Sequence, residues 1–423
     1  MSAALAALPR GFLARYEAGG GRLSGDRAAR AAAARALAAG FPGPHDEAWR
    51  YTSLRPLAEH AWAEPPVATP DPAALLARFD AIDAPRIVFV NGGWREDLSR
   101  PPAHWRRPDR AGARPGARPG TLARPEREPM VALNTLFAED GALIELPAGV
   151  DGGTVLLLHL ALGTAEAPFA CHPRHRIRLG AGARLALVEA SVGEGVYLHN
   201  PVTEILLGEH AVLSHARLQD EAADGFHLAT LYGTLARGAH YDGFLLALGA
   251  RLSRAEAHVT LEGEGGRVHL NGGQLLAGTQ HADFTSVVRH AAPACASRQT
   301  VKSVLGGMAR GVFQGRIEVA REAQKTDGYQ RAQALLLSPD AEVDIKPELE
   351  IFADDVKCSH GATVGALDAE QIFYLRSRGI PAAEARAMLV RGFLAEALAD
   401  IAAGPARTML EQAVELWWRR QQP

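Results

Sequence analysis

Hydrophobic and polar positions divide the chain into three parts. Residues 1 to about 80 are rich in Ala and Leu at helical spacing, and residues 27–39 predict a helix that ends before Gly40. From about 150 to 360, short apolar runs alternate with Gly-containing turns, and long helical patterns are absent. Helical spacing returns after Gly365. The pattern therefore predicts a β-rich centre between two helical ends.

The central part contains runs of strand length and a loose repeat. The runs are residues 155–158, 177–179, 184–188, 211–213, 244–246 and 259–261. Leu179, Leu207 and Leu235 each precede a turn and lie 28 residues apart, and turns after Leu305 and Leu337 resume the repeat less regularly. Such a period is typical of a solenoid, in which a parallel β-helix buries an interior column of apolar side chains. A β-sandwich would also give short strands with turns.

Further elements lie on either side of this centre. A short strand at 87–90 ends at a turn, and residues 100–129, rich in Pro, Gly and Arg, predict an exposed loop whose charge is solvated. After the centre, residues 367–379 predict a helix with Asp368 as its N-cap. Pro381 opens a second helix, and a third follows it. These helices could cover the open edge of a solenoid or dock a partner.

Composition limits the class of protein. The 423 residues have a net charge of −3, which argues against nucleic acid as the main partner. Three cysteines give no disulfide framework, and free thiols fit a reducing compartment. No apolar run reaches the roughly 18 to 20 residues of a membrane span, and the N-terminus lacks a signal-peptide pattern. We therefore expect a cytoplasmic protein without a membrane partner.

Cys358 and His360 form the most specific candidate site. Alternating apolar residues at Leu349 and Ile351 favour a strand here, and side chains two residues apart on a strand point to the same face. Cys and His are both suited to zinc or iron. Two ligands do not complete a tetrahedral site, so a metal bound here would need ligands from elsewhere.

Other candidate chemistry is weaker. We expect structural or surface roles for the remaining Cys and for scattered His residues, namely Cys171, His172, His175, His281, His290 and Cys295. Phosphate-loop, dinucleotide-binding and nucleophile-elbow motifs are absent from the sequence. Acidic residues between 348 and 355 leave open an acid/base pair, as in a β-helix carbohydrate-active enzyme.

Three long stretches, at 326–342, 346–365 and 370–380, closely resemble the SufB/SufD family, whose members are scaffold components of the Suf iron–sulfur cluster assembly machinery. A weaker match lies at 47–52. SufB-type chains are longer and often have a Cys-rich motif in their N-terminal half, whereas this chain has no Cys before Cys171. Within the family, the chain is therefore more similar to the SufD type.

The resemblance implies a mainly β fold with three domains. A right-handed parallel β-helix would occupy residues 146–365. It would lie between an N-terminal helical region with a linker, at 1–145, and a C-terminal helical domain, at 366–423.

The resemblance also implies partners and site residues. Family members of this type assemble with a SufB paralogue and two copies of the ATPase SufC. The C-terminal helical domain of SufB and that of SufD each dock one SufC. The two β-helices meet near their C-terminal ends. The family's Cys-Ser-His motif falls on Cys358 and His360, and the histidine is implicated in assembling a transient iron–sulfur cluster with ligands from SufB. The incomplete ligand pair fits this arrangement.

Two predictions for function follow, from different classes. The leading one is a non-catalytic scaffold subunit for iron–sulfur cluster assembly, with ATP hydrolysis confined to the partner ATPase. The alternative is the carbohydrate-active enzyme with its acidic cluster at 348–355. A third possibility is a homodimeric metal-binding module similar to SufD, which would bind metal through His360 without any partner.

Overall fold

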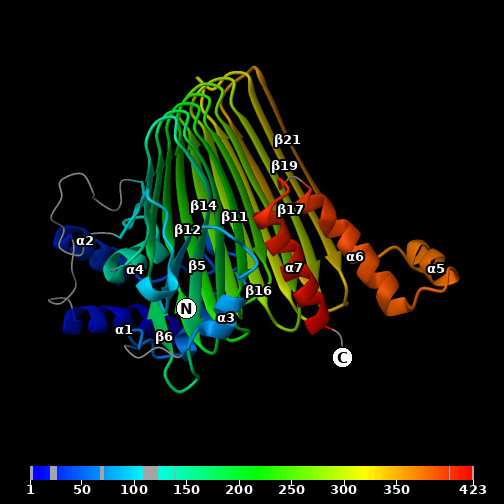
Figure 1. Cartoon of the computed structure of the whole chain (residues 1–423), viewed down its shortest axis with the longest axis horizontal. Coiled ribbons are helices and arrows are strands. Elements are labelled where there is room, and N and C mark those ends of the chain that lie inside the picture. Colours follow the sequence, from blue (N-terminus) through cyan, green and yellow to red (C-terminus); the bar gives the residue numbers. More distant parts are fainter. Residues whose placement is uncertain are drawn as a thin grey trace.

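The chain forms a two-sheeted parallel β-solenoid with helices at both ends (Figure 1). The computed structural model describes residues 3–19, 26–66, 71–107, 122–138, 140–399 and 401–421, and the side chains from residue 7 onward. Strands account for 42% of the residues, which confirms the mainly β prediction. Most of the loop predicted at 100–129 lies outside the described residues.

The strands alternate between two sheets as the chain advances. Sheet 1 contains, in spatial order, β2 (Gly93–Trp94), β1 (Arg86–Val90), β5 (Asp151–Leu162), β8 (Arg184–Glu194), β11 (Val212–Asp220), β13 (His240–Ala247), β15 (Arg267–Leu276), β17 (Ala296–Leu305), β19 (Thr326–Leu336) and β21 (Val356–Gly365). Sheet 2 contains β20 (Glu342–Ile351), β18 (Arg310–Val319), β16 (His281–His290), β14 (Leu252–Leu261), β12 (Phe226–Leu235), β10 (Val202–Leu207), β7 (Arg174–Leu179), β4 (Leu143–Leu146) and β3 (Trp105–Arg106), with β6 (Phe169–Cys171) and β9 (Tyr197–His199) joined to β12. Each turn of the solenoid contributes one strand to each sheet, and there are about eight turns. The predicted strands therefore form a solenoid and not a sandwich of antiparallel sheets.

The predicted repeat corresponds to the turns of the solenoid. Leu207 pairs with Leu179 on one side and with Leu235 on the other, at the ends of three neighbouring strands of sheet 2. The same row continues through Leu261, His290, Val319 and Ile351. The turns after Leu305 and Leu337 belong to sheet 1, where the backbone N–H of Leu337 donates to the carbonyl of Leu305. The repeat is irregular in sequence because the later turns contain different numbers of residues.

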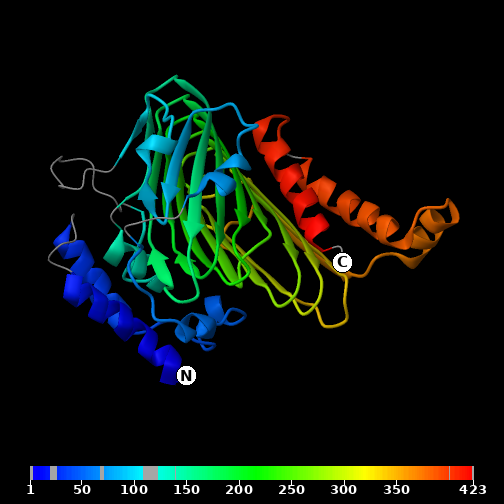
Figure 2. The same cartoon turned by 60° about the horizontal axis from the view of Figure 1, so that its bottom comes forward.

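Helices cover the outer face of each sheet (Figure 2). At the N-terminal end lie α1 (Ala3–Gly19), α2 (Arg27–Ala38), η1 (Glu47–Trp49), η2 (Arg55–Glu59), α3 (Ala73–Ala77), η3 (Glu96–Leu98) and α4 (Pro129–Phe137). Phe12 of α1, Leu37 of α2 and Leu133 of α4 share one apolar cluster with Phe226 and Leu252 of sheet 2. The helix predicted at 27–39 is confirmed as α2.

The C-terminal helices are α5 (Ala369–Ser377), α6 (Ala382–Leu398) and α7 (Pro405–Arg420). The Asp368 carboxylate accepts the N–H of Glu370 at 2.8 Å, which confirms the predicted N-cap. Val390 of α6 and Leu410 of α7 pack on outward-facing residues of sheet 1 such as Leu246. The helices therefore cover the flank of sheet 1, so the expectation that they cover the open edge of the solenoid is wrong. Among the described strands, the last strand of sheet 1, β21, pairs with β19 only. Among the described helices, none has both the length and the hydropathy that crossing a membrane requires.

Candidate functional site

Cys358 and His360 lie on β21, the last strand of sheet 1, so the predicted strand is confirmed. Cys358 is opposite Gly328 of β19, and His360 is opposite Gln330. Cys358 packs against the apolar cluster around Ile317, which places its side chain on the inner face of the last turn. Because alternate residues of a strand share a face, His360 belongs to the same face.

The two side chains differ in environment. Cys358 is half-buried, and burial raises the pKa of its thiol, with a further upward contribution from the nearby Asp327 carboxylate. Its thiol is therefore protonated near neutral pH, and a metal must displace that proton to bind. His360 is exposed to solvent. Among the described residues, the groups of three or more clustered ligand side chains do not include either residue. The pair remains an incomplete ligand set within this chain.

The site lies at the open end of the solenoid. β20 and β21 are the terminal strands of their sheets, and each pairs with one neighbour only among the described strands. An unpaired strand edge presents free backbone N–H and C=O groups that can pair with another chain. Ile351, Phe352 and Val364 are 39%, 68% and 54% exposed at this end. The end of the solenoid therefore combines an open edge with exposed apolar side chains.

The acidic residues at 348–355 form surface ion pairs. Glu350 lies 3.4 Å from an Arg316 guanidinium nitrogen, and Glu348 lies 3.2 Å from Lys346 Nζ. Asp354 and Asp355 are exposed in the turn that follows β20. None of these four carboxylates is buried, whereas a glycosidase needs a carboxylic acid held neutral by its surroundings. The geometry gives the carbohydrate-active alternative no support.

The side chains of Cys171, His172 and His175, for which structural or surface roles were predicted, face different parts of the molecule. His172 faces the N-terminal helices, and its Nδ1 lies 3.0 Å from Asn200 Oδ1. His175 faces the interior, where its Nδ1 accepts the N–H of Ala142 at 3.0 Å. Cys171 is fully buried, and burial together with the nearby Glu221 charge raises the pKa of its thiol. These contacts agree with structural roles.

The other scattered residues also have structural contacts. His281 Nε2 lies 3.0 Å from the Thr52 hydroxyl, and His290 Nε2 lies 2.9 Å from the Ser297 hydroxyl. The Cys295 thiol donates to the Gly263 carbonyl at 3.3 Å.

Sequence reasoning missed two groups of potential ligands among the described residues. Glu128, Glu256 and His258 form one, and His199, Glu221 and His227 form the other, which lies inside the solenoid. A signal for the two histidines His199 and His227 was present in the sequence. Cys171, His199 and His227 are separated by the same 28 residues as the leucine repeat, and they are neighbours in register on β6, β9 and β12. The repeat therefore aligns polar residues as well as leucines along the solenoid.

The sequence is similar to a known protein family and to several known proteins. Residues 161–393, more than half of the chain, match the family model described as "SUF system FeS cluster assembly, SufBD core domain". The SufBD family protein slr0076 of Synechocystis is 30% identical over 88% of this chain and 87% of its own length. The iron–sulfur cluster assembly protein SufD of Escherichia coli is 32% identical over 85% of each chain. The chloroplastic protein ABCI7 of Arabidopsis thaliana is 34% identical over 57% of this chain and 51% of its own.

The matched segment spans the strands from β6 to β21, which include the Cys358/His360 strand, and most of α6. The solenoid fold, the motif and two relatives matched over most of their length agree with one another. The chain belongs to the SufBD family of iron–sulfur cluster assembly proteins.

Proposed function

We propose that this chain is a non-catalytic scaffold subunit that contributes half of a shared cluster-assembly site. The observation that carries this proposal is the incomplete Cys358/His360 pair on a strand at the open end of the solenoid. A ligand pair that needs further ligands lies at the surface where a second chain can supply them. The nascent iron–sulfur cluster is the cargo of this site.

The partner that fits this end is a SufB-like paralogue. A second β-solenoid can continue the sheets by pairing its terminal strands with β20 and β21, so that main-chain hydrogen bonds provide affinity. Phe352 and Val364 would be buried by that contact. The relative named SufD and the family description both concern the same assembly system.

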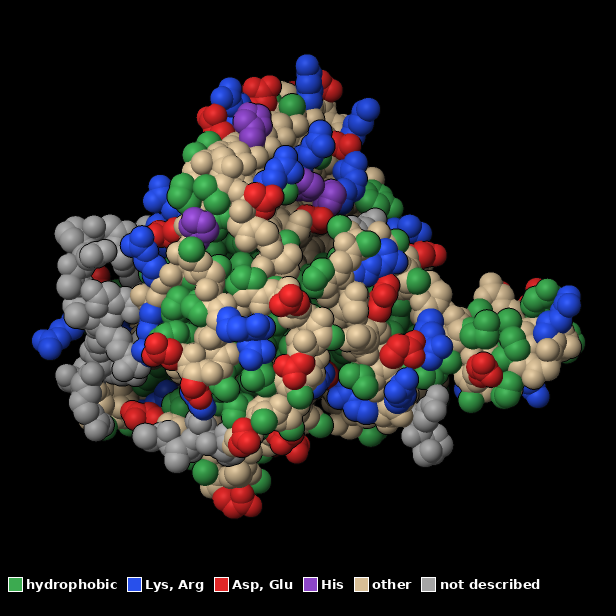
Figure 3. Space-filling view, viewed as in Figure 1, with side chains coloured by type: hydrophobic (Ala, Val, Ile, Leu, Met, Phe, Trp, Pro, Cys, Tyr) green, Lys and Arg blue, Asp and Glu red, His purple; other side chains and the backbone are tan. Residues whose placement is uncertain are grey.

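The partner ATPase, similar to SufC, would dock on the C-terminal helices. The α5 helix extends away from the solenoid, and hydrophobic side chains gather on this projecting part (Figure 3). Phe373 and Tyr374 of α5 are 74% and 57% exposed. ATP hydrolysis would take place in that partner. Cys171, Cys295 and Cys358 are all free thiols, which suits work in the reducing cytoplasm.

Anaerobic cluster assembly on the complete complex tests this function. The complex would contain this chain or its variant, the SufB-like paralogue and the ATPase, with iron, sulfide and reductant supplied. We expect His360→Ala to lower the yield of cluster strongly, and Cys358→Ala to lower it less because a half-buried thiol can serve packing alone. Ser359→Ala, between them on the opposite face of β21, is the matched control. Normal assembly with His360→Ala would show that the site is elsewhere.

A further inference from the structure

A row of buried imidazoles runs through the interior of the solenoid. It consists of His175, His159, His199 and His227, whose neighbouring ring centroids lie 4.9, 5.0 and 5.2 Å apart. All four side chains are buried, with exposed fractions of 1–6%. Polar groups placed so deep are costly unless they are paired, and proteins commonly pair them with hydrogen bonds or metal ions.

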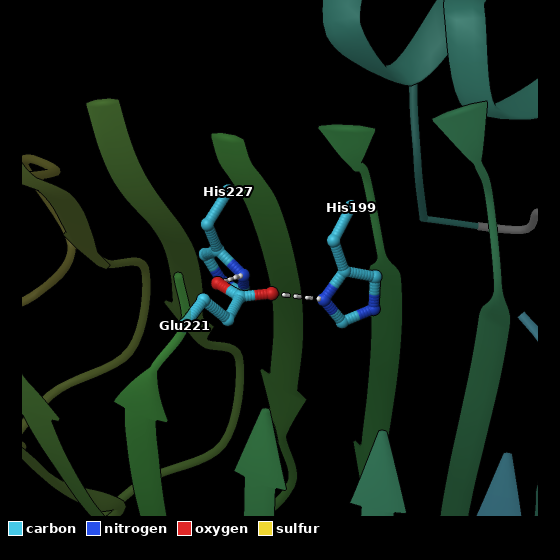
Figure 4. A group of neighbouring side chains, drawn as sticks. All are labelled: His199, Glu221 and His227. Atoms are coloured by element: carbon cyan, nitrogen blue, oxygen red, sulfur yellow. Dashed lines mark hydrogen bonds and ion pairs between the residues drawn. The ribbon is translucent and has the colours of Figure 1, made fainter. Parts of the chain in front are cut away.

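Glu221 approaches His199 and His227 from the opposite sheet. It is the residue after β11, and it enters the interior between His199 on β9 and His227 on β12 (Figure 4). Its Oε1 lies 3.0 Å from His199 Nδ1, and its Oε2 lies 2.8 Å from His227 Nδ1. The three side chains offer ligand atoms that all lie within 4.8 Å of one another. Two imidazoles and one carboxylate therefore converge on one point.

Hydrogen bonding leaves several of these nitrogen atoms unsatisfied. His227 Nδ1 is close to Glu221 but makes no hydrogen bond of acceptable geometry. His199 Nε2 and both ring nitrogens of His159 also have no hydrogen-bond partner, although His159 Nε2 lies 3.7 Å from Glu189. Buried polar atoms without partners are rare, and each requires an explanation.

We propose that His199, Glu221 and His227 form a buried site for one divalent transition-metal ion inside the solenoid. Two histidines and a carboxylate are a known ligand set for zinc, and the same set suits Fe²⁺. The site is separate from Cys358 and His360, which lie on the last strand. It does not depend on the proposed scaffold function.

The fold is built to hold such a site in place. His199 and His227 are neighbours in register on parallel strands, so the backbone fixes their spacing. Gln219 Nε2 donates to Glu221 Oε2 at 3.0 Å, as groups behind a metal-binding carboxylate commonly do. Two cavities of about 10 and 20 Å³ lie beside Gln219 and His227, each with room for roughly one water molecule. The ligands can therefore adjust by small rotations without moving the strands.

Metal content of the purified full-length chain tests the proposal. The protein would be expressed in medium supplemented with Zn²⁺ and also refolded with Zn²⁺, because the interior is closed to solvent once the chain has folded. After removal of loosely bound ions, we expect about one equivalent of zinc by elemental analysis. X-ray absorption should show nitrogen and oxygen neighbours with the multiple scattering of imidazole.

Variants distinguish this site from others. His227→Gln and Glu221→Gln should lose the bound zinc, whereas His290→Gln, another fully buried inward-facing histidine, should keep it. The double variant Cys358→Ala with His360→Ala should also keep it, whatever that variant does to cluster assembly. Circular dichroism and the melting temperature identify variants that fold. A folded wild type without zinc after both treatments, zinc retained in folded His227→Gln, or sulfur in the first coordination shell would each overturn the proposal.

Discussion

Glu256 of β14 and Glu128, the N-cap residue of α4, are neighbours whose pKa values are displaced in opposite directions. Burial would raise the pKa of Glu256, but the Arg254 guanidinium and His258 outweigh it and lower this pKa to about 2. Burial raises the pKa of Glu128 to about 7, and the charge of Glu256 adds to that increase. One carboxylate is therefore ionised throughout the physiological range, while the other titrates near neutrality.

Glu128 should make the fold less stable as pH rises. Its ordinary pKa of 4.5 applies in the unfolded chain, so between pH 4.5 and about 7 the unfolded state loses this proton first and the folded state is penalised. Glu128→Gln removes that penalty. The side chain is partly exposed, so solvent reduces the size of this effect. We expect the difference in the free energy of unfolding between the variant and wild type to grow by roughly 2 kcal/mol from pH 5 to pH 8. Urea unfolding of both proteins at pH 5 and at pH 8 measures this difference.

The exposed residue Glu126 gives the matched control. Glu126→Gln should follow the wild-type dependence on pH. If Glu128→Gln gains no stability between the two pH values, the carboxyl of Glu128 is ionised in the folded chain at neutral pH.

At the residue level, sequence alone could predict the Cys358/His360 pair, because both lie on one strand at a spacing that sets their relative direction. It could not predict that Glu221 meets His199 and His227. Glu221 comes from sheet 1 and the histidines from sheet 2, and their approach depends on the lengths of the intervening turns. Local periodicity contains no information on that distance.

At the level of elements, the weakly matching segment at 47–52 anchors the N-terminal region to sheet 2. The Arg254 guanidinium lies 4.1 Å from the centre of the Trp49 ring. The Thr52 hydroxyl donates to Asp283 at 2.5 Å, and Glu47 forms an ion pair with Lys346. These contacts reach β14, β16 and β20, so the segment ties several turns of the solenoid together.

Trp49→Ala should therefore destabilise the fold by about 3 kcal/mol, through loss of a buried ring and of its contact with Arg254. Denaturant unfolding checks this value. Tyr51→Ala, a half-buried aromatic neighbour, is the control and should cost less. Equal losses in the two variants would mean that Trp49 has no special part in attaching this segment.

The sequence predicted where these elements lie along the chain better than it predicted what they pack against. The strands, the Asp368 N-cap and the C-terminal helices are confirmed because each follows from local spacing or capping. The expectation that the C-terminal helices cover the open edge of the solenoid is wrong for α6 and α7. Their apolar faces cover sheet 1, and Lys302 fixes this arrangement by donating to the Phe393 carbonyl at 2.9 Å and pairing with Glu396. Helical periodicity gives the buried face of a helix without identifying what covers it.

At the scale of the whole molecule, the C-terminal helices have two different surfaces. α6 and α7 bury apolar residues of sheet 1, so removing residues 366–423 would expose that face and cause aggregation. α5 instead projects from the solenoid with Phe373 and Tyr374 exposed. Deleting residues 366–423 would therefore affect folding and partner binding together, whereas point variants on α5 test partner binding alone.

Replacing Phe373 and Tyr374 together by Asp should weaken binding of the partner ATPase roughly tenfold or more, and leave the melting temperature of this chain unchanged. Isothermal titration with the purified ATPase measures the affinity. Met308→Asp places a charge on a solenoid turn at a similarly exposed position, 62%, and should have no effect. Unchanged affinity in the α5 variant would exclude this helix as the docking surface.

The open end of the solenoid is central to this account, because a shared site requires a second chain at that end. Hydrogen–deuterium exchange of this chain, alone and in complex with the SufB-like paralogue and the ATPase, tests it most directly. Amides of β20 and β21 should exchange more slowly in the complex, while those of the interior strands β11 and β12 should not change. A complex that forms with unchanged exchange in 342–365 would contradict the claim that this end, with Cys358 and His360, is where the partner binds.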